Sequence, residues 1–301
     1  MFLPLTAKST RKAQPRPCSY RAAGRMAKTM KMRWIAAVAA VAFTCSLHSF
    51  AQNAAQNGEI DGIAHIAYRV SNLNNELAFL KKLGYEESFA MTHAGRTTEV
   101  FVKVNDRQFL EIYPRTSPNQ PLGWMHVCFE SADLNALHDQ LVARGLHPSH
   151  VEKAGAGNLI FALRDPDGRT TEFTQYMPGS KHTLDRGKHL GADRVSDMLL
   201  GFDLPVANVS AAGKFYGQLG FNVAQTESGL RMSAPGNPNM RIEVRAARPG
   251  AEAETLFLIS DARKATADLH YEGLNAKRMK KIVFVPDPDG NLLVFLQARP
   301  Q

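Results

Sequence analysis

A histidine–glutamate pair occurs twice in this chain with the same spacing. His65 precedes Glu111 by 46 residues, and His126 precedes Glu172 by the same 46 residues. The second pair follows the first at an offset of 61 residues at both positions. Because coincidence rarely produces such matched spacing, the sequence predicts two successive copies of one structural unit.

Both copies have the same order of expected elements: a strand, a helix and three further strands. In the first copy the hydrophobic pattern predicts a strand at 62–70 and an amphipathic helix at 75–83, which ends before Gly84. In both copies the histidine lies on the first strand and the glutamate on the last. The other expected strands are 86–93, 97–104, 108–113, 125–129 and 170–176, and the second helix is 133–144.

A weaker copy of this pair of units follows a polar segment, 177–197. It has expected strands at 200–204, 241–245, 255–259 and 292–296 and a helix at 211–219. Asp165-Pro-Asp-Gly168 of the second unit recurs as Asp287-Pro-Asp-Gly290 in the fourth. Proline and glycine at these positions predict a tight turn before the last strand of each unit.

The second pair of units does not keep the histidines and glutamates of the first. Gly201 stands near the position of His65, and Val294 stands at the position of Glu172. The counterpart of His126 is expected near Thr255 or Leu256, and only Glu243 keeps its residue type. We therefore expect no metal in residues 198–301.

The positive charge of the chain is concentrated at its N-terminus. The net charge is +8, but residues 1–51 hold nine of the 36 Lys and Arg residues and no Asp or Glu. Residues 52–301 therefore carry 27 basic and 28 acidic side chains. A nearly neutral body lacks the basic surface that binds nucleic acid, so that class of function is excluded.

Residues 1–51 have the pattern of a secretory signal peptide. Lys28, Lys31 and Arg33 precede the apolar run 34–47, and Ser49-Phe50-Ala51 provides small residues for cleavage after Ala51. The run is shorter than the roughly 20 residues that span a bilayer, so we expect export to the periplasm or medium without a stable membrane anchor. An uncleaved anchor and an organelle transit sequence are the alternatives.

The repeated motifs resemble those of the vicinal oxygen chelate superfamily, which includes glyoxalase, bleomycin-resistance and extradiol dioxygenase proteins. The resemblance covers residues 60–298 and implies an α+β fold of four βαβββ modules in two paired domains, each a curled mixed sheet with helices outside. The domains implied are 60–177 and 198–301, joined by a linker at 178–197. The motifs that carry it are His65-Ile-Ala-Tyr-Arg-Val70, Leu83-Gly-Tyr85, Phe109-Leu-Glu-Ile-Tyr113, His126-Val-Cys-Phe129 and Asp165-Pro-Asp-Gly-Arg-Thr-Thr-Glu-Phe173.

The resemblance also implies a metal site in the first domain. His65, Glu111, His126 and Glu172 fall on the four ligand positions of the metal-binding glyoxalase type. Two imidazoles and two carboxylates suit a divalent ion, with Ni, Co, Zn, Mn and Fe all compatible. In the dioxygenase branch the position of Glu111 is not a ligand, and the metal lies in the second domain.

The activity implied is lyase or isomerase chemistry on a small molecule with vicinal oxygens, through a metal-stabilised enediolate. Glu172 and Glu111 are the candidate catalytic bases, because a loosely held carboxylate can leave the ion and accept a proton. Two alternatives stay open: a non-haem iron ring-cleaving dioxygenase, and a non-catalytic protein that binds a drug or metabolite. A small-molecule substrate is the expected partner, and assembly as a homodimer is left open by the sequence.

Overall fold

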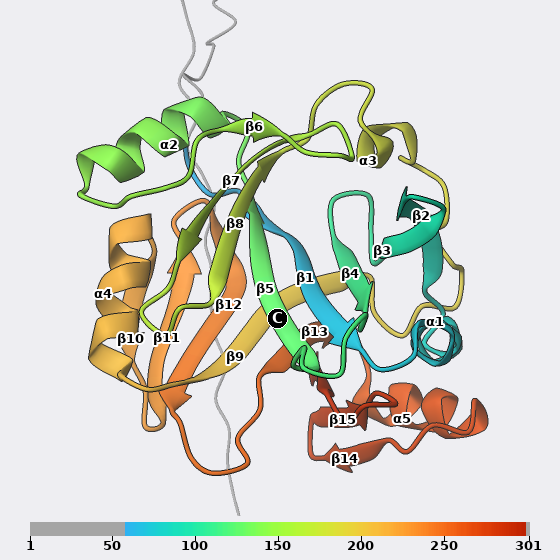
Figure 1. The fold of residues 1–301 in the computed structure, drawn as a ribbon. Helices are drawn as coiled ribbons and strands as arrows, with labels where there is room; N and C mark the ends of the chain where they lie inside the picture. Colours follow the sequence, from blue (N-terminus) through green and yellow to red (C-terminus); the bar gives the residue numbers. More distant parts are fainter. Residues whose placement is uncertain (1–57, 299–301) are drawn as a thin grey trace, which may run out of the picture. The chain divides into compact units, whose positions relative to one another are not determined.

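The computed structural model describes residues 58–298, which belong to one compact unit. The presequence expected at 1–51 lies outside these residues. Two eight-stranded mixed sheets with helices packed against them confirm the α+β class and the paired modules (Figure 1). No helix among residues 58–298 is long and apolar enough to cross a membrane.

The first sheet holds the two units that contain the histidine–glutamate pairs. Its strand order is β2-β3-β4-β1-β5-β8-β7-β6, with β1 antiparallel to β5 at the centre and parallel to β4, and with β5 parallel to β8. The elements are β1 (Gly62–Val70), α1 (Leu73–Lys82), β2 (Glu86–His93), β3 (Arg96–Lys103), β4 (Phe109–Pro114), β5 (Gly123–Glu130), α2 (Leu134–Ala143), β6 (Glu152–Lys153), β7 (Leu159–Arg164) and β8 (Thr170–Gln175).

The second sheet repeats this arrangement with the order β10-β11-β12-β9-β13-β16-β15-β14. A short helix, α3 (Lys181–Leu184), lies between the sheets in sequence. The domain boundaries expected at 177–178 and 197–198 stay a prediction. The remaining elements are β9 (Met198–Val206), α4 (Val209–Leu219), β10 (Asn222–Gln225), β11 (Gly229–Ala234), β12 (Asn237–Ala246), β13 (Glu254–Ile259), α5 (Ala262–Tyr271), β14 (Lys277–Met279), β15 (Ile282–Pro286) and β16 (Leu292–Gln297).

The main helix of each unit begins in the same way. An Asn or Asp in extended conformation precedes the helix, and its side chain accepts a hydrogen bond from a backbone N–H of the first turn. Because this partner satisfies an N–H group that the helix leaves free, the cap fixes where each helix starts. The four caps are Asn72, Asp133, Asn208 and Asp261.

The two Asp-Pro-Asp-Gly turns connect the sheets. Gly168 and Gly290 have φ angles of 81° and 92°, as the tight turns require. Asp289 accepts hydrogen bonds from the backbone N–H and the hydroxyl of Ser71, and Asp167 accepts one from the backbone N–H of Ala207. Ser71 and Ala207 directly precede the caps of α1 and α4. Each turn therefore fastens one sheet to the start of a helix on the other.

One hydrophobic cluster also joins the sheets. It includes Ile66 and Phe129 of the first sheet and Phe202 and Phe257 of the second, all buried. The rings of Trp124 and Phe202 meet across the boundary, with centroids 5.9 Å apart. The first sheet is therefore supported by the second along its central strands, which carry the candidate site.

Candidate metal centre

The four residues singled out by the sequence lie on the four central strands of the first sheet. His65 is on β1, Glu111 on β4, His126 on β5 and Glu172 on β8. Ala67 pairs with both Glu111 and His126, while Cys128 pairs with both His65 and Glu172. Since paired residues share a face of the sheet, this register brings all four side chains to one face.

The two imidazoles meet on this face, and each approaches both carboxylates. The Nε2 atoms of His65 and His126 are 3.2 Å apart, and each lies 3.1 Å from Glu111 Oε2. Glu172 Oε2 lies 3.4 Å from His126 Nε2 and 3.8 Å from His65 Nε2. Ligands about 2.1 Å from one ion stand roughly 3.0 to 3.4 Å apart, so the arrangement fits a divalent cation.

Burial differs between the four residues. His65, Glu111 and His126 are 6%, 4% and 4% exposed, whereas the side chain of Glu172 is 21% exposed. Glu172 is thus both the most distant and the most accessible member. It is the residue that solvent or a bound molecule reaches most easily.

The electrostatics of the cluster favour positive charge at its centre. Burial disfavours the charged form of His65, but the nearby carboxylate of Glu111, with help from Glu172, raises the pKa of His65 to about 10. Burial likewise opposes ionisation of Glu111, yet the imidazoles of His65 and His126 hold its pKa below the usual range. The same carboxylates that stabilise a proton on His65 would stabilise a metal cation bound in place of that proton.

Tyr113 is a neighbour of the site that the sequence did not single out. Its hydroxyl donates to Glu111 Oε1 at a distance of 2.9 Å, leaving Oε2 for the imidazoles. Tyr113 follows Glu111 by two residues on β4, so strand alternation places both on the same face. This spacing could have identified Tyr113 from the sequence. Glu99 on β3 is a further neighbour of the site. Burial, followed by the charge of Glu111, raises the pKa of Glu99.

Cys128 lies against the centre. Its Sγ is within 4.8 Å of ligand atoms of His65 and Glu172. Burial, followed by the charge of Glu172, raises the pKa of the Cys128 thiol well above its ordinary value. A neutral buried thiol makes an apolar wall rather than a ligand.

The second sheet holds different residues at the equivalent positions. The register places Gly201, Glu243 and Val294 where the sequence expected them, but the counterpart of His126 is Glu254, not Thr255 or Leu256. Arginines neutralise both glutamates. Arg231 and Arg241 contact Glu243 at 2.7 and 2.8 Å, and Arg245 contacts Glu254 at 3.4 Å.

Solved structures with this fold include dioxygenases and a Mn(II)-bound glyoxalase. A catechol 2,3-dioxygenase shares 14% identity, with a TM-score of 0.63 over 80% of this chain and 90% of that chain. The 2,3-dioxygenase LapB from Pseudomonas sp. KL28 shares 16%, with a TM-score of 0.62 over 80% and 93%. The Mn(II)-bound glyoxalase from Novosphingobium aromaticivorans shares 16%, with a TM-score of 0.59 over 79% and 82%.

These likenesses establish a common fold. No curated protein matches the chain by sequence. Residues 62–173, which span the four converging side chains, match the sequence profile of the Glyoxalase/Bleomycin resistance protein/Dioxygenase superfamily. The sequence match thus covers the part of the first sheet that holds the candidate ligands, and the solved structures share the fold over about 80% of the chain.

Proposed function

We propose that this chain is a divalent-metal-dependent enzyme with lyase or isomerase activity on a small molecule that offers two neighbouring oxygens. The observation that carries the proposal is that the two imidazole Nε2 atoms lie 3.2 Å apart and that each lies 3.1 to 3.8 Å from one oxygen of each carboxylate. His65, Glu111, His126 and Glu172 would hold the ion. When bound, such an ion acts as a Lewis acid that polarises the oxygens of the substrate.

The two glutamates would have different roles. Tyr113 holds Oε1 of Glu111, which is nearly fully buried, so Glu111 is fixed as a ligand. Glu172 lies farther from both imidazoles and is more exposed. A carboxylate that can swing away from the cluster can accept a proton from substrate carbon. Of the two candidate bases expected from the sequence, the geometry favours Glu172.

A second candidate function is a ring-cleaving dioxygenase. His65, His126 and Glu111 form a subset in which every pair of ligand atoms is within 3.2 Å. Two histidines and one carboxylate are the ligands of non-haem ferrous sites. The more distant Glu172 would leave room for a diol and dioxygen. The dioxygenases with this fold favour the same candidate.

We also propose that the chain is exported and cleaved after Ala51, on the sequence pattern alone. Intact-mass analysis of the protein from the medium or periplasm of an expressing bacterium tests this. A mature chain that begins at Gln52 is expected. A full-length chain in the cytoplasm would contradict export.

Elemental mass spectrometry of the chain, purified without a polyhistidine tag, tests the metal. About one ion per wild-type chain is expected, and none in a double variant with His126→Ala and Glu172→Ala. Bound iron with oxygen uptake on a catechol would select the dioxygenase. Bound metal with a ligand that returns chemically unchanged would select a binding protein, and a chain that takes up no metal would overturn the proposal.

A further inference from the structure

His182 of α3 is a buried histidine beside the candidate metal centre, contributed by the segment between the two sheets. It is 4% exposed. Its ring packs against four aromatic rings with centroids 4.8 to 5.0 Å away: Phe89, Phe101, Phe109 and Tyr176. Phe101 pairs with Glu111, and Phe109 pairs with His65. His182 therefore packs directly on the two residues that flank the candidate ligands.

The hydrogen bonds of Asn158 assign the tautomer of His182. Asn158 Oδ1 accepts from the backbone N–H of Met177 at 3.1 Å, so its Nδ2 faces His182 Nδ1, 2.8 Å away. An amide nitrogen only donates, so Nδ1 of His182 is the acceptor. In the neutral ring the proton then resides on Nε2, which becomes a donor.

That donor has no acceptor among residues 58–298. His182 Nε2 is buried and makes no hydrogen bond with them. Burial, followed by the positive charge of His65, lowers the pKa of His182 to about 3, so the ring stays neutral at ordinary pH. A buried N–H without a partner opposes folding, so it needs an explanation, and a role in binding is one.

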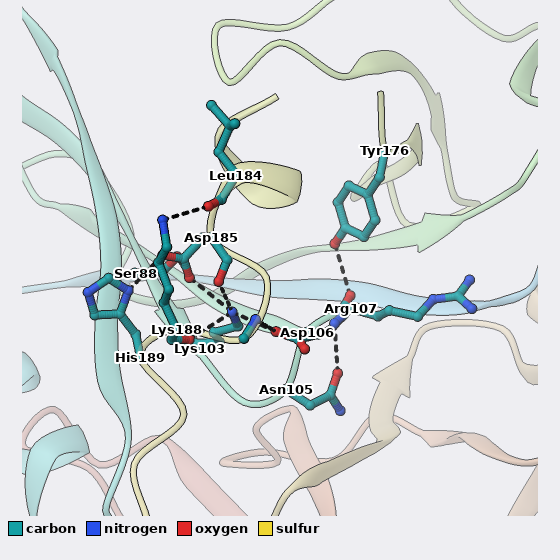
Figure 2. Close-up of polar contacts among 11 residues, drawn as sticks. Ser88, Lys103, Asn105, Asp106, Arg107, Tyr176, Leu184, Asp185, Lys188 and His189 are labelled. Carbon is teal, nitrogen blue, oxygen red and sulfur yellow. Dashed lines mark hydrogen bonds and ion pairs between the residues drawn. The ribbon is translucent and has the colours of Figure 1, made fainter. Parts of the chain in front are cut away.

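The segment does not need His182 as an anchor, because Lys103 already holds it. Lys103 is fully buried on β3, and its Nζ donates to Asp185 Oδ2 at 3.0 Å and to the carbonyl of Lys188 at 2.9 Å (Figure 2). Ser88 donates to Asp185 as well. A phenylalanine would fill this aromatic cage and remove the unpaired Nε2–H, but it would leave the buried Nδ2 of Asn158 without its acceptor. The bond with Asn158 accounts for Nδ1 of His182 and leaves the Nε2–H unexplained. Packing alone therefore does not account for the histidine.

We propose that His182 is a substrate-binding residue whose Nε2–H donates a hydrogen bond to an oxygen of the molecule bound at the four-residue centre. Asn158 positions the ring by fixing its tautomer. The inference rests on the proposed function and adds that the substrate presents an oxygen acceptor toward α3. A neutral N–H donor stabilises negative charge that develops on such an oxygen.

Three variants of the full chain test the role of Nε2. His182→Gln places an amide N–H near the position of Nε2, His182→Asn keeps an acceptor for Asn158 but lacks the distal donor, and His182→Phe keeps only the packing. Each is loaded with Co²⁺ and titrated with 4-nitrocatechol, a coloured vicinal diol whose absorption reports binding. Metal content and thermal unfolding are measured on the same samples.

We expect all variants to bind one Co²⁺. His182→Phe should unfold at a lower temperature than His182→Asn, because only the asparagine keeps an acceptor for Asn158 Nδ2. The Kd for 4-nitrocatechol should rise about tenfold or more in His182→Phe and His182→Asn, the loss expected for a hydrogen bond to a charged group. His182→Gln should stay within about threefold of wild type, the range left when a donor is retained.

Failure of this inference can be told apart from failure of the proposed function. Equal Kd values in wild type and His182→Phe, with Co²⁺ bound by both, overturn the role of His182 and leave the metal site standing. If wild-type chain takes up Co²⁺ but does not bind 4-nitrocatechol, the role of His182 is likewise overturned and the metal site stands. Wild-type chain that takes up no Co²⁺ overturns both.

Discussion

His65 and His126 are 61 residues apart in the chain, yet their Nε2 atoms lie 3.2 Å apart. The reason is the antiparallel pairing of β1 with β5, in which Ala67 faces His126 and Cys128 faces His65. The parallel neighbours β4 and β8 then add Glu111 and Glu172 on either side. The two histidine–glutamate pairs thus approach each other about the centre of one sheet.

Replacing Glu111 by Gln should weaken metal binding. The variant removes one anionic ligand and the partner of both imidazoles, so the loss in affinity should exceed the roughly 10- to 100-fold that loss of an outer partner costs. Glu243→Gln is the matched control, because Glu243 holds the equivalent position on β12. Competition with a chromophoric chelator measures both. Equal affinities in the two variants would contradict a site on the first sheet.

The Asp-Pro-Asp-Gly turn of the fourth unit should contribute to stability through Asp289. Asp289→Ala removes the hydrogen bonds from the backbone N–H and hydroxyl of Ser71 and should lower the free energy of unfolding by about 1 to 2 kcal/mol. Asp139→Ala, on the exposed surface of α2, should change it by less than about 0.5 kcal/mol. Urea unfolding gives both values. A loss no larger than that of Asp139→Ala would argue against the turn as a connection between the sheets.

Lys103→Met should destabilise the chain by about 3 to 5 kcal/mol, because it leaves the buried carboxylate of Asp185 without its cation. Lys264→Met is the control. Lys264 pairs with Asp268 on the exposed surface of α5, where such a pair contributes about 0.2 to 0.5 kcal/mol. Chemical unfolding compares the two variants. If their losses were similar, Lys103 would not hold the segment that carries α3.

Glu76 should make the chain less stable as pH rises. Burial, followed by the charges of Asp287 and Asp289, raises the pKa of Glu76 to about 9 from 4.5. Between these values the folded chain keeps a proton that the unfolded chain releases, so stability falls with increasing pH. The contribution of this residue is about 1.4 kcal/mol per pH unit.

Glu76→Gln should remove this contribution. The stability of the variant relative to wild type should therefore increase as the pH is raised from 5 to 9. Glu152→Gln, on exposed β6, should follow the wild-type curve. Thermal unfolding across this pH range measures the difference. Parallel curves for wild type and Glu76→Gln would show that Glu76 ionises normally in the folded chain.

The sequence predicted most of the architecture because the chain repeats itself. The strands that carry the candidate site, the helices of the first three units, the two turns and the repeated histidine–glutamate spacing follow from local patterns. The resemblance to a known superfamily then implied the ligand role of His65, Glu111, His126 and Glu172. Local signals were weaker in the second half. The counterpart of His126 was misplaced because it depends on which residue of β13 faces Asp203 of β9, and residue types do not reveal that register.

Other features exist only in three dimensions. The contact of Asp289 with Ser71 joins residues 218 positions apart, and nothing in either local sequence points to the other. The burial of Lys103 and the packing of His182 among four aromatic rings depend on how the segment after β8 crosses the first sheet.

Repetition thus indicated the successive units from sequence alone, and the resemblance of their motifs to a known superfamily implied the fold and the candidate ligands. Tertiary structure decided which glutamate is fixed and which is accessible, and which polar groups are buried without partners. The physical reason is that residue type and spacing set which face of a strand a side chain occupies. Exposure and pairing depend on every segment packed against that face.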